Sequence, residues 1–251
     1  MDLISIIIPY YKKKKFIDQS LKSIFSQTHF NYEVLIIYDD QDQTDLYYLR
    51  DKYSKNPKVK FIVNQKNLGA GKSRNIGINK SQGRYIAFLD ADDIWKENKI
   101  KKQLEFMKNA FAKASHTSYE IINEKNQIIG FRKAKHFKDY KELLKSCDIG
   151  LSSVIIEKNI FKDDVYFAHL KTKEDFVLWL KILQKKIQFY ALDENLLSWR
   201  KNENSLSSSI KRKLFDGFKV YNKYMNFNFL TSLYYLFILS INFILKNMKI
   251  K

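Results

Sequence analysis

Short apolar runs alternate with helix-like amphipathic stretches throughout the first 95 residues of the chain. This alternation is typical of a parallel sheet whose strands are joined by crossover helices. Strands are predicted at residues 3–8, 33–38, 59–63 and 84–89, and helices at about 14–27, 44–55 and 70–80. The chain is therefore expected to have an α/β core with a mostly parallel central sheet.

The pattern changes after this core. A helix is predicted near residues 96–111 and alternating runs at 117–123 and 127–133, followed by a mixed region through 200. With 251 residues, 45% of them hydrophobic, the chain can bury the core of one large or two small domains. Two prolines and seven glycines leave no segment that resembles a linker. The second half is expected to be a subdomain attached to the first.

Charge and cysteine content narrow the possible surroundings of the protein. Its 45 basic and 27 acidic side chains give a net charge of +18, which attracts nucleic acid, anionic lipid or phosphorylated substrates alike. The lone Cys147 excludes an internal disulfide and fits a reducing compartment. The N-terminus has no basic region and no small-residue cleavage site, so residues 3–8 are interpreted as a strand and not a signal peptide.

Polar residues follow each predicted strand of the core. Ligands bind outside the carboxyl ends of the strands in such sheets, so these residues are the candidates for a site. One edge of the sheet is expected to collect carboxylates in an otherwise basic protein. The residues are Pro9-Tyr10-Tyr11, Asp39-Asp40, Asn64 with Asn67-Leu68-Gly69, and Asp90-Ala91-Asp92-Asp93.

The acidic residues after the fourth strand suggest a cation site. Asp90 and Asp92 are two positions apart, which places both carboxylates on one side of an extended tip, where they can hold a hard divalent cation. A cation there would stabilise the charge on a departing diphosphate. The alternative is an acidic turn that caps the helix predicted to start near Trp95.

Two nucleotide-binding motifs are poor fits to residues 67–73. Gly71-Lys72-Ser73 matches the end of a phosphate-binding loop, but residue 66 is Lys where that motif needs glycine. The dinucleotide fingerprint also fails, because Arg74 stands where it needs glycine or alanine. A nucleoside triphosphatase is therefore disfavoured.

Taken together, the motifs resemble those of a bacterial family 2 glycosyltransferase. They agree in order, spacing and strand context over about 200 residues. The matching segments are Ser5-Ile-Ile-Ile-Pro-Tyr-Tyr11, Asp39-Asp40 with Thr44-Asp45, Asn67-x-Gly69 with Arg74-Asn75-x-Gly77, Gly83 to Asp93, and Glu174-Asp175-Phe-Val-Leu-Trp179.

The resemblance implies a GT-A fold and inverting transfer from a nucleotide diphosphate sugar. By similarity, Pro9 and Tyr10 would line the base pocket, Asp39 or Asp40 would accept from the base or ribose, and Arg74 would lie near the phosphates or the sugar. Asp90 would bind the ribose or donor sugar, and Asp92 would be the main ligand of Mn²⁺ or Mg²⁺. The implied donor site as a whole comprises Pro9, Tyr10, Tyr11, Asp39, Asp40, Asn67, Gly69, Lys72, Arg74, Asp90, Ala91, Asp92 and Arg200.

Similarity also implies that Asp175, beside Glu174, is the catalytic base. Displacement at the anomeric carbon needs a carboxylate that takes the proton of the acceptor hydroxyl. The alternative is an acidic first turn of a helix, which favours negative charge in any case. The two interpretations are compatible.

Some residues depart from the family pattern or have weaker assignments. The loop Asp39-Asp-Gln-Asp-Gln-Thr-Asp45 has one more residue than usual and no glycine, which leaves open whether Asp39, Asp40 or Asp42 faces the nucleotide. His116 and His169 are better explained as ordinary polar residues than as metal ligands. Arg200 with Ser205 and Ser207 resembles a late family segment that could close over the donor phosphates; the alternative is a polar loop.

The C-terminal stretch 227–245 is aromatic and aliphatic, with lysines on both sides. Residues 229–245 fall just short of a membrane span, which favours an interfacial helix with Tyr221, Tyr224, Tyr234 and Tyr235 at the level of the lipid headgroups. The alternative is a helix packed on protein. The basic run Lys12–Lys15 is interpreted as a solvated face or as a second membrane contact.

The sequence thus predicts a GT-A catalytic domain at 1–205, with a nucleotide-sugar-binding half at 1–95 and an acceptor-side half at 96–205. A membrane-associating helical extension follows at 206–251. The expected donor is a UDP-sugar, and the expected acceptor is a surface polysaccharide, lipooligosaccharide or lipid-linked glycan at the inner face of the cytoplasmic membrane. The alternatives are a catalytically inactive scaffold with the same fold and, less favoured, a nucleic-acid-binding protein. The sequence does not predict the oligomeric state.

Overall fold

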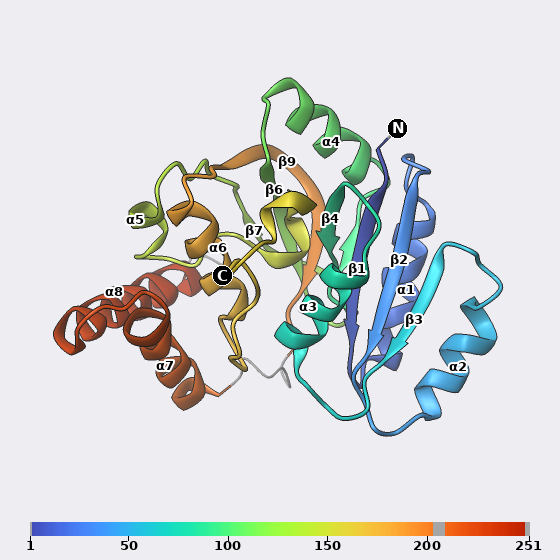
Figure 1. Cartoon of the computed structure of the whole chain (residues 1–251), viewed down its shortest axis with the longest axis horizontal. Coiled ribbons are helices and arrows are strands. Elements are labelled where there is room, and N and C mark those ends of the chain that lie inside the picture. The colour runs from blue at the N-terminus through green and yellow to red at the C-terminus, as the bar shows by residue number, and fades with distance from the viewer. Residues whose placement is uncertain (1, 203–208, 249–251) are drawn as a thin grey trace.

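A single mixed sheet of nine strands organises the protein (Figure 1). The computed structural model describes residues 2–202 and 209–248. The strand order is β3-β2-β1-β4-β8-β6-β9-β5, and β7 pairs with β6 outside this path. Helices lie on both faces of the sheet, and the C-terminal helices α7 and α8 extend from the side opposite β3 (Figure 1).

The first half confirms the predicted α/β core. Strands β1, β2, β3 and β4 pair in parallel, so their carboxyl ends meet at one edge of the sheet. Each element matches its predicted range to within a few residues. The elements are β1 (Ile4–Tyr10), α1 (Lys14–Phe25), β2 (Tyr32–Tyr38), α2 (Thr44–Tyr53), β3 (Val59–Val63), α3 (Ala70–Lys80) and β4 (Tyr85–Phe88).

The second half extends the same sheet with antiparallel and parallel pairs. Strand β8 joins β4 to β6 in antiparallel pairing, whereas β6 and β9 are parallel. The helix predicted at 96–111 begins only at Lys99, because Ile94 and Trp95 pair with β9 as a short strand. The elements are β5 (Ile94–Trp95), α4 (Lys99–Asn109), β6 (Ala114–Ile122), β7 (Ile128–Arg132), α5 (Tyr140–Leu143), β8 (Ile155–Glu157), α6 (Glu174–Gln184) and β9 (Phe189–Arg200).

Two apolar cores lie on opposite faces of the sheet. Alternate residues of β1 point to opposite faces, so Ile6 and Ile8 join the core beneath α1, α2 and α4, while Ile7 joins the core beneath α3 and α6. Helix α3 lies so close to β1 that a Cβ on Gly77 would be 2.5 Å from Cγ2 of Ile7. These contacts hold the ends of β1 and β4, and the loops that follow them, in fixed positions.

The C-terminal helices pack on the end of α6. They comprise α7 (Ile210–Lys219), a π-helical turn (Val220–Tyr224) and α8 (Phe229–Met248). The expectation that Tyr221 faces lipid headgroups is wrong, because Tyr221 is fully buried, stacks on Tyr235 and donates a 2.6 Å hydrogen bond to the carbonyl of Leu144. The aromatic cluster around Tyr221 therefore joins α8 to the rest of the molecule.

Helix α8 is also longer than predicted. Among the described residues it is the one helix that is long and apolar enough to cross a membrane, judged by length and composition alone. One face nevertheless packs on protein, with Ser232 and Leu239 buried, while Leu230 and Phe237 are exposed. The helix thus combines the two interpretations that the sequence leaves open.

Candidate active site

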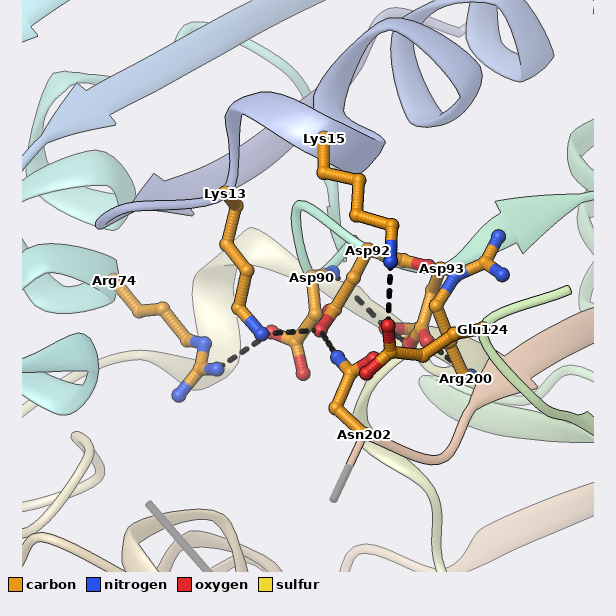
Figure 2. Close-up of polar contacts among 10 residues, drawn as sticks. Lys13, Lys15, Arg74, Asp90, Asp92, Asp93, Glu124, Arg200 and Asn202 are labelled. Carbon is orange, nitrogen blue, oxygen red and sulfur yellow. Dashed lines mark hydrogen bonds and ion pairs between the residues drawn. The ribbon is translucent and has the colours of Figure 1, made fainter. Parts of the chain in front are cut away.

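The candidate site lies at the carboxyl edge of the sheet, between β1 and β4. Strand β1 has β2 on one side and β4 on the other, which makes this position the topological switch point where open α/β sheets bind ligands. The loop after β1 leads to Lys13, at the N-terminus of α1, and the loop after β4 contains Asp90 and Asp92. Figure 2 shows the side chains of Lys13 and Asn202 directed at Asp92, and that of Arg74 directed at Asp90.

Asp93 fixes the shape of the acidic loop. Its buried carboxylate accepts hydrogen bonds from Ser152 Oγ at 2.6 Å and from the backbone N–H of Arg200 at 2.8 Å. Burial, reinforced by the neighbouring carboxylates of Asp92 and Asp90, raises the pKa of Asp93 well above its ordinary value. The sequence contains Asp93 in the matching motif but does not predict this structural role, which depends on partners about 60 and 107 residues away.

Asp92 is the residue that the sequence predicts as the main metal ligand. Its Oδ2 accepts hydrogen bonds from Lys13 Nζ at 2.7 Å and from Asn202 Nδ2. Burial raises the pKa of Asp92, and the charge of Lys13 opposes this effect. Within residues 2–202 and 209–248, no three acidic, histidine or cysteine side chains form a complete metal cage. The site fits a Mg²⁺- or Mn²⁺-type cation held by one or two carboxylates and completed by substrate phosphates.

Neither histidine considered in the sequence belongs to this site. His116 is buried in β6, where its Nε2 lies 2.8 Å from the carbonyl oxygen of Lys135 and its ring packs near Phe137. Burial lowers the pKa of His116 to about 4, so the ring is neutral at physiological pH. His169 is exposed. The structure supports the interpretation of His116 as an ordinary polar residue.

Asp39 holds the turn that leads into α3. Its carboxylate accepts from Asn64 Nδ2 at 2.7 Å and from the backbone N–H groups of Leu68 and Gly69, each at 2.8 Å. Asn67 donates to the Asp39 carbonyl at 2.9 Å. Gly69 has a φ of +83°, a conformation that favours glycine, which explains the Asn-x-Gly pattern. The turn directs the N-terminus of α3 toward the edge that holds the site.

The remaining residues of the second loop have different surroundings. Asp40 is buried and accepts a 3.3 Å bond from the backbone of Asp42, whereas Asp42 itself accepts from the N–H and hydroxyl of Thr44 at the start of α2. Tyr10 is fully buried, stacks on Tyr38 with ring centroids 5.2 Å apart, and donates to Asp45 at 2.7 Å. These contacts hold Tyr10 and the loop after β2 in place at the carboxyl edge of the sheet.

The other residues that the sequence predicts for the donor site belong to β1 and the loop after it, the loop after β4 and α3. Pro9 is the second-last residue of strand β1, and Tyr11 follows the strand with its side chain exposed. Ala91 is buried within the acidic loop, and Lys72 is exposed on the first turn of α3. Contacts among the described residues do not test whether these four residues bind the nucleotide, so their roles stay predictions.

Arg74 joins the loop after β4 to the start of α6. Its guanidinium is 4% exposed and lies 2.7 Å from Asp90 Oδ1 and 2.7 Å from Glu174 Oε1. These carboxylates come from segments 84 residues apart in sequence, and Arg74 belongs to a third segment. The guanidinium is also 5.4 Å from the ring centroid of Phe167. The sequence predicts that Arg74 belongs to the site but not that it bridges these two carboxylates.

Glu174 and Asp175 begin α6, but their carboxylates have different partners. Glu174 is paired with Arg74, and burial raises its pKa to about 7 against the opposing charge of that arginine. Asp175 accepts a 2.7 Å bond from the backbone N–H of Phe176 through Oδ1. Burial also raises the pKa of Asp175. The pair therefore presents one carboxylate that is paired with Arg74 and a neighbouring carboxylate whose pKa is raised by burial.

Arg200 braces the acidic loop from the other side. Its Nε donates to the Asp92 carbonyl at 2.8 Å, Nη1 to the Asn123 carbonyl at 3.0 Å, and Nη2 to Gln19 Oε1 at 2.9 Å. The guanidinium also lies 4.6 Å from the ring centroid of Phe16. Ser205 and Ser207 lie outside the described residues, so closure over the donor phosphates stays a prediction.

The basic run at the start of α1 is paired with carboxylates around this edge. Lys13 pairs with Asp92, Lys14 lies 3.4 Å from Asp45, and Lys15 lies 2.5 Å from Glu124 (Figure 2 shows the first and third). Lys13 therefore contacts the acidic loop, whereas the side chains of Lys14 and Lys15 are 52% and 65% exposed, which supports the interpretation of a solvated face for these two. A membrane contact of this run stays a prediction.

Comparisons with known proteins agree with this geometry. The sequence pattern described as Glycosyl transferase family 2 matches residues 5–166. The chain is 32% identical over 237 residues to the Escherichia coli UDP-Glc:alpha-D-GlcNAc-diphosphoundecaprenol beta-1,3-glucosyltransferase WfgD, covering 93% of this chain and 90% of that protein. Some relatives are much longer, and the chain spans only 30% of an uncharacterised glycosyltransferase of Rickettsia conorii, at 35% identity over 72% of this chain.

Solved structures confirm the expected GT-A fold. The Staphylococcus aureus TarS 1–349 fragment, solved with UDP-GlcNAc, has a TM-score of 0.71 and 23% identity, over 89% of this chain and 65% of that one. The mannosyltransferase PcManGT of Pyrobaculum calidifontis, solved with GDP-Man and Mn²⁺, has a TM-score of 0.69 and 13% identity, over 93% and 69%. At these identities the likeness establishes the fold alone.

The buried Arg74 bridge predicts a large loss of stability when the guanidinium is removed. Arg74→Met is expected to lower the free energy of unfolding by about 3 kcal/mol, because two partly desolvated carboxylates lose their counterion. Arg84 is a matched control, since it also contacts two carboxylates, Asp2 and Glu157, each at 3.2 Å, but is 59% exposed. Arg84→Met is expected to cost no more than about 1 kcal/mol. Urea unfolding at pH 7 measures both, and equal losses would contradict the structural importance of the Arg74 bridge.

Proposed function

Because the chain belongs to glycosyltransferase family 2, we propose that it inverts the anomeric centre of a UDP-sugar while transferring the sugar to a hydroxyl of a lipid-linked or surface glycan. The observation that supports this most is the continuous chain of side chains Asp90–Arg74–Glu174. It joins the acidic loop after β4 to the start of α6. A donor bound beside Asp90 would thus have the candidate base, Asp175, at the Glu174 end of these paired side chains.

The donor would bind along the carboxyl edge of β1, β2 and β4. We assign Pro9, Tyr10 and Tyr11 to the base pocket, and Asp39 or Asp40 to the base or ribose, as the sequence predicts. The position of Asp39 supports this assignment, because its carboxylate lies at this edge and holds the turn of Leu68 and Gly69 that leads into α3. The UDP identity rests on the printed donor of WfgD, which is UDP-Glc.

Asp92, with Asp90 beside it, would hold Mn²⁺ or Mg²⁺ together with the donor phosphates. When bound, such a cation neutralises the charge that develops on the departing diphosphate. The chain's own contribution is to keep the Asp92 carboxylate in place. Arg200 does this by holding the loop's backbone, and Asp93 by its two buried hydrogen bonds.

The chemical step follows from the position of Asp175. Asp175 would take the proton of the acceptor hydroxyl as the hydroxyl oxygen forms a bond to the anomeric carbon. On the opposite face, the bond from this carbon to the diphosphate oxygen breaks, and UDP leaves with the electron pair. One displacement inverts the anomeric configuration. Glu174, held by Arg74, would fix the orientation of the first turn of α6.

The alternative of a catalytically inactive scaffold has less support. Asp92 and Asp175 are both present, and each has the partly buried surroundings that raise carboxylate pKa values in active sites. A nucleic-acid-binding role is weaker still, because the lysines nearest the sheet's binding edge, Lys13, Lys14 and Lys15, are paired with carboxylates.

The C-terminal helices suggest that the enzyme meets its acceptor at a membrane surface. Side chains of α7 and α8 form an exposed apolar face, and basic residues lie beside it: Lys213 Nζ is 4.7 Å from the Phe243 ring centroid and Lys219 Nζ is 4.0 Å from that of Phe215. The exposed apolar members are Ile210, Leu214, Phe215, Phe229, Leu230, Leu233, Tyr234, Phe237, Ile241, Phe243, Ile244 and Leu245. An apolar face bordered by lysines fits an anionic lipid interface.

We therefore propose a peripheral enzyme at the inner face of the cytoplasmic membrane, with residues 1–205 catalytic and 206–251 the attachment to lipid. Helix α8 would lie in the interface, because its other face is bound to the protein through Tyr235, stacked on Tyr221, and through Asn242, which donates to the Lys145 carbonyl at 2.8 Å. Lys246 pairs with Asp148, so it is less available to lipid phosphates than the sequence suggests.

The test of catalysis compares three proteins on a panel of UDP-sugars with Mn²⁺. Wild type is expected to release UDP from one donor. Asp175→Asn should lower kcat by about 10²- to 10⁴-fold, the usual contribution of a general base, while donor affinity is unchanged. Asp18→Asn is the control, because Asp18 accepts hydrogen bonds from Tyr48, Tyr53 and Lys52 away from the acidic loop and should retain full kcat.

Two outcomes would count against this assignment. Asp175→Asn with wild-type kcat would exclude Asp175 as the base. If wild type releases no UDP, donor binding is measured in the same samples by calorimetry. Binding without release shows that the acceptor is missing from the assay, whereas binding of no donor would favour the scaffold alternative.

The membrane proposal predicts that charge on α8 weakens lipid binding. The double variant Leu230→Glu/Phe237→Glu should bind vesicles of phosphatidylglycerol and phosphatidylcholine more than about tenfold more weakly in a flotation assay, since two large apolar side chains no longer enter the interface. Phe111→Glu is the control, because Phe111 is 93% exposed but lies after α4, outside the apolar face. Equal binding by all three proteins would exclude this face as the attachment.

A further inference from the structure

Arg132 is the last residue of β7 and lies directly opposite Tyr119 of β6. The two residues are partners in the antiparallel register of these strands, so their side chains lie on the same face of the sheet. Burial raises the pKa of Tyr119, the charge of Arg132 lowers it, and the carboxylate of Asp175 raises it further. Arg132 and the candidate base Asp175 therefore both lie near the Tyr119 side chain.

Arg132 also meets the end of α8, the helix proposed to contact lipid. Its Nη2 lies 3.5 Å from the carbonyl oxygen of Lys246, in the last turn of α8. Lys246 is itself held by an ion pair with Asp148 and a hydrogen bond to Ser146 Oγ. Phe243, about one turn before Lys246, belongs to the exposed apolar face. Arg132 thus lies between the proposed lipid contact and the proposed base.

Positive charge at this point exceeds the negative charge that pairs with it. Across residues 2–202 and 209–248, the half-buried Arg132 contacts carbonyl oxygens but forms no ion pair with a carboxylate. Burial lowers the pKa of Lys246 to about 8, and the positive charges of Arg132 and Lys135 lower it further. Asp148 is the carboxylate that pairs with this group. Partial burial of a cation is costly unless an anion offsets its charge, so the group suits an anionic ligand.

We propose that Arg132 binds the phosphate group that joins the acceptor sugar to its lipid. The ligand is a phosphate or diphosphate ester of a long-chain alcohol. Its chain lies along the apolar face of α8, its phosphate lies against Arg132, and the hydroxyl of its sugar reaches Asp175. A guanidinium offers two parallel N–H donors that match the oxygen atoms of phosphate. This assignment rests on the proposed function, which takes the acceptor to be lipid-linked.

The test measures binding of farnesyl diphosphate, a diphosphate on an apolar chain, to the full chain by isothermal calorimetry. EDTA is present, so that the probe cannot bind through a cation at Asp92. The proteins are wild type, Arg132→Gln, Arg132→Lys and Lys133→Gln, and thermal melts confirm that each is folded. Lys133 is the matched control, because it follows Arg132 in sequence but pairs with Asp193 at 2.7 Å and is 75% exposed.

Arg132→Gln is expected to weaken binding of the probe about tenfold, whereas Arg132→Lys and Lys133→Gln stay within about threefold of wild type. Farnesol and inorganic pyrophosphate should each bind wild type at least about tenfold more weakly than the probe, since each lacks one of its two contacts. The assignment is wrong if wild type and Arg132→Gln bind the probe equally, or if wild type does not bind it. Displacement of the probe by excess UDP would also contradict it, because the probe would then occupy the donor site.

Vesicle flotation separates the acceptor's phosphate from ordinary lipid headgroups. Arg132→Gln should bind phosphatidylglycerol vesicles within about threefold of wild type, because the apolar face of α7 and α8 provides that contact. A loss of vesicle binding with unchanged binding of the probe would make Arg132 a headgroup contact and overturn the assignment. Probe binding needs neither donor nor turnover, so a failure of the proposed transfer reaction is distinguishable from a failure of this subsite.

Discussion

The ion pairs of Arg74 with Asp90 and Glu174 are the contacts on which the site depends. A buried guanidinium is costly unless carboxylates offset its charge, and here one carboxylate comes from the loop after β4 and the other from the start of α6. The same bridge positions the start of α6, and with it Asp175, relative to the loop of Asp92. Burial raises the pKa of Glu174 to about 7, and the charge of Arg74 opposes that rise. The arginine thus joins the two acidic segments and opposes the effect of burial on the pKa of Glu174.

A strongly basic protein therefore concentrates its carboxylates where a cation and a diphosphate are expected. Each carboxylate at this edge has a distinct role. Asp39 holds a turn, Asp93 fixes a loop, and Asp92 pairs with Lys13. Lysines elsewhere on the chain, beside the apolar face of α7 and α8, suit an anionic lipid surface.

The sequence predicts the α/β core well, because hydrophobic periodicity and local turn residues determine where each strand and helix begins. It also predicts that Asp92, Arg74 and Asp175 share one site, since their motifs follow strands of one sheet edge or resemble the family pattern. The pairing of Lys13 with Asp92, the bracing by Arg200 and the burial of Tyr221 were not predictable. Each depends on contacts between segments about 80 to 110 residues apart, for which local patterns carry no signal.

The central claim is that Asp175 acts across the Arg74 bridge in a single displacement. Its most direct test is the anomeric configuration of the product, determined by proton NMR from the coupling constant of the transferred sugar, with the α-linked UDP-sugar that the enzyme uses. A single displacement is expected to give a β-linked product. An α-linked product would show retention, which requires a second displacement or a different geometry, and would contradict the assignment of Asp175 as the base.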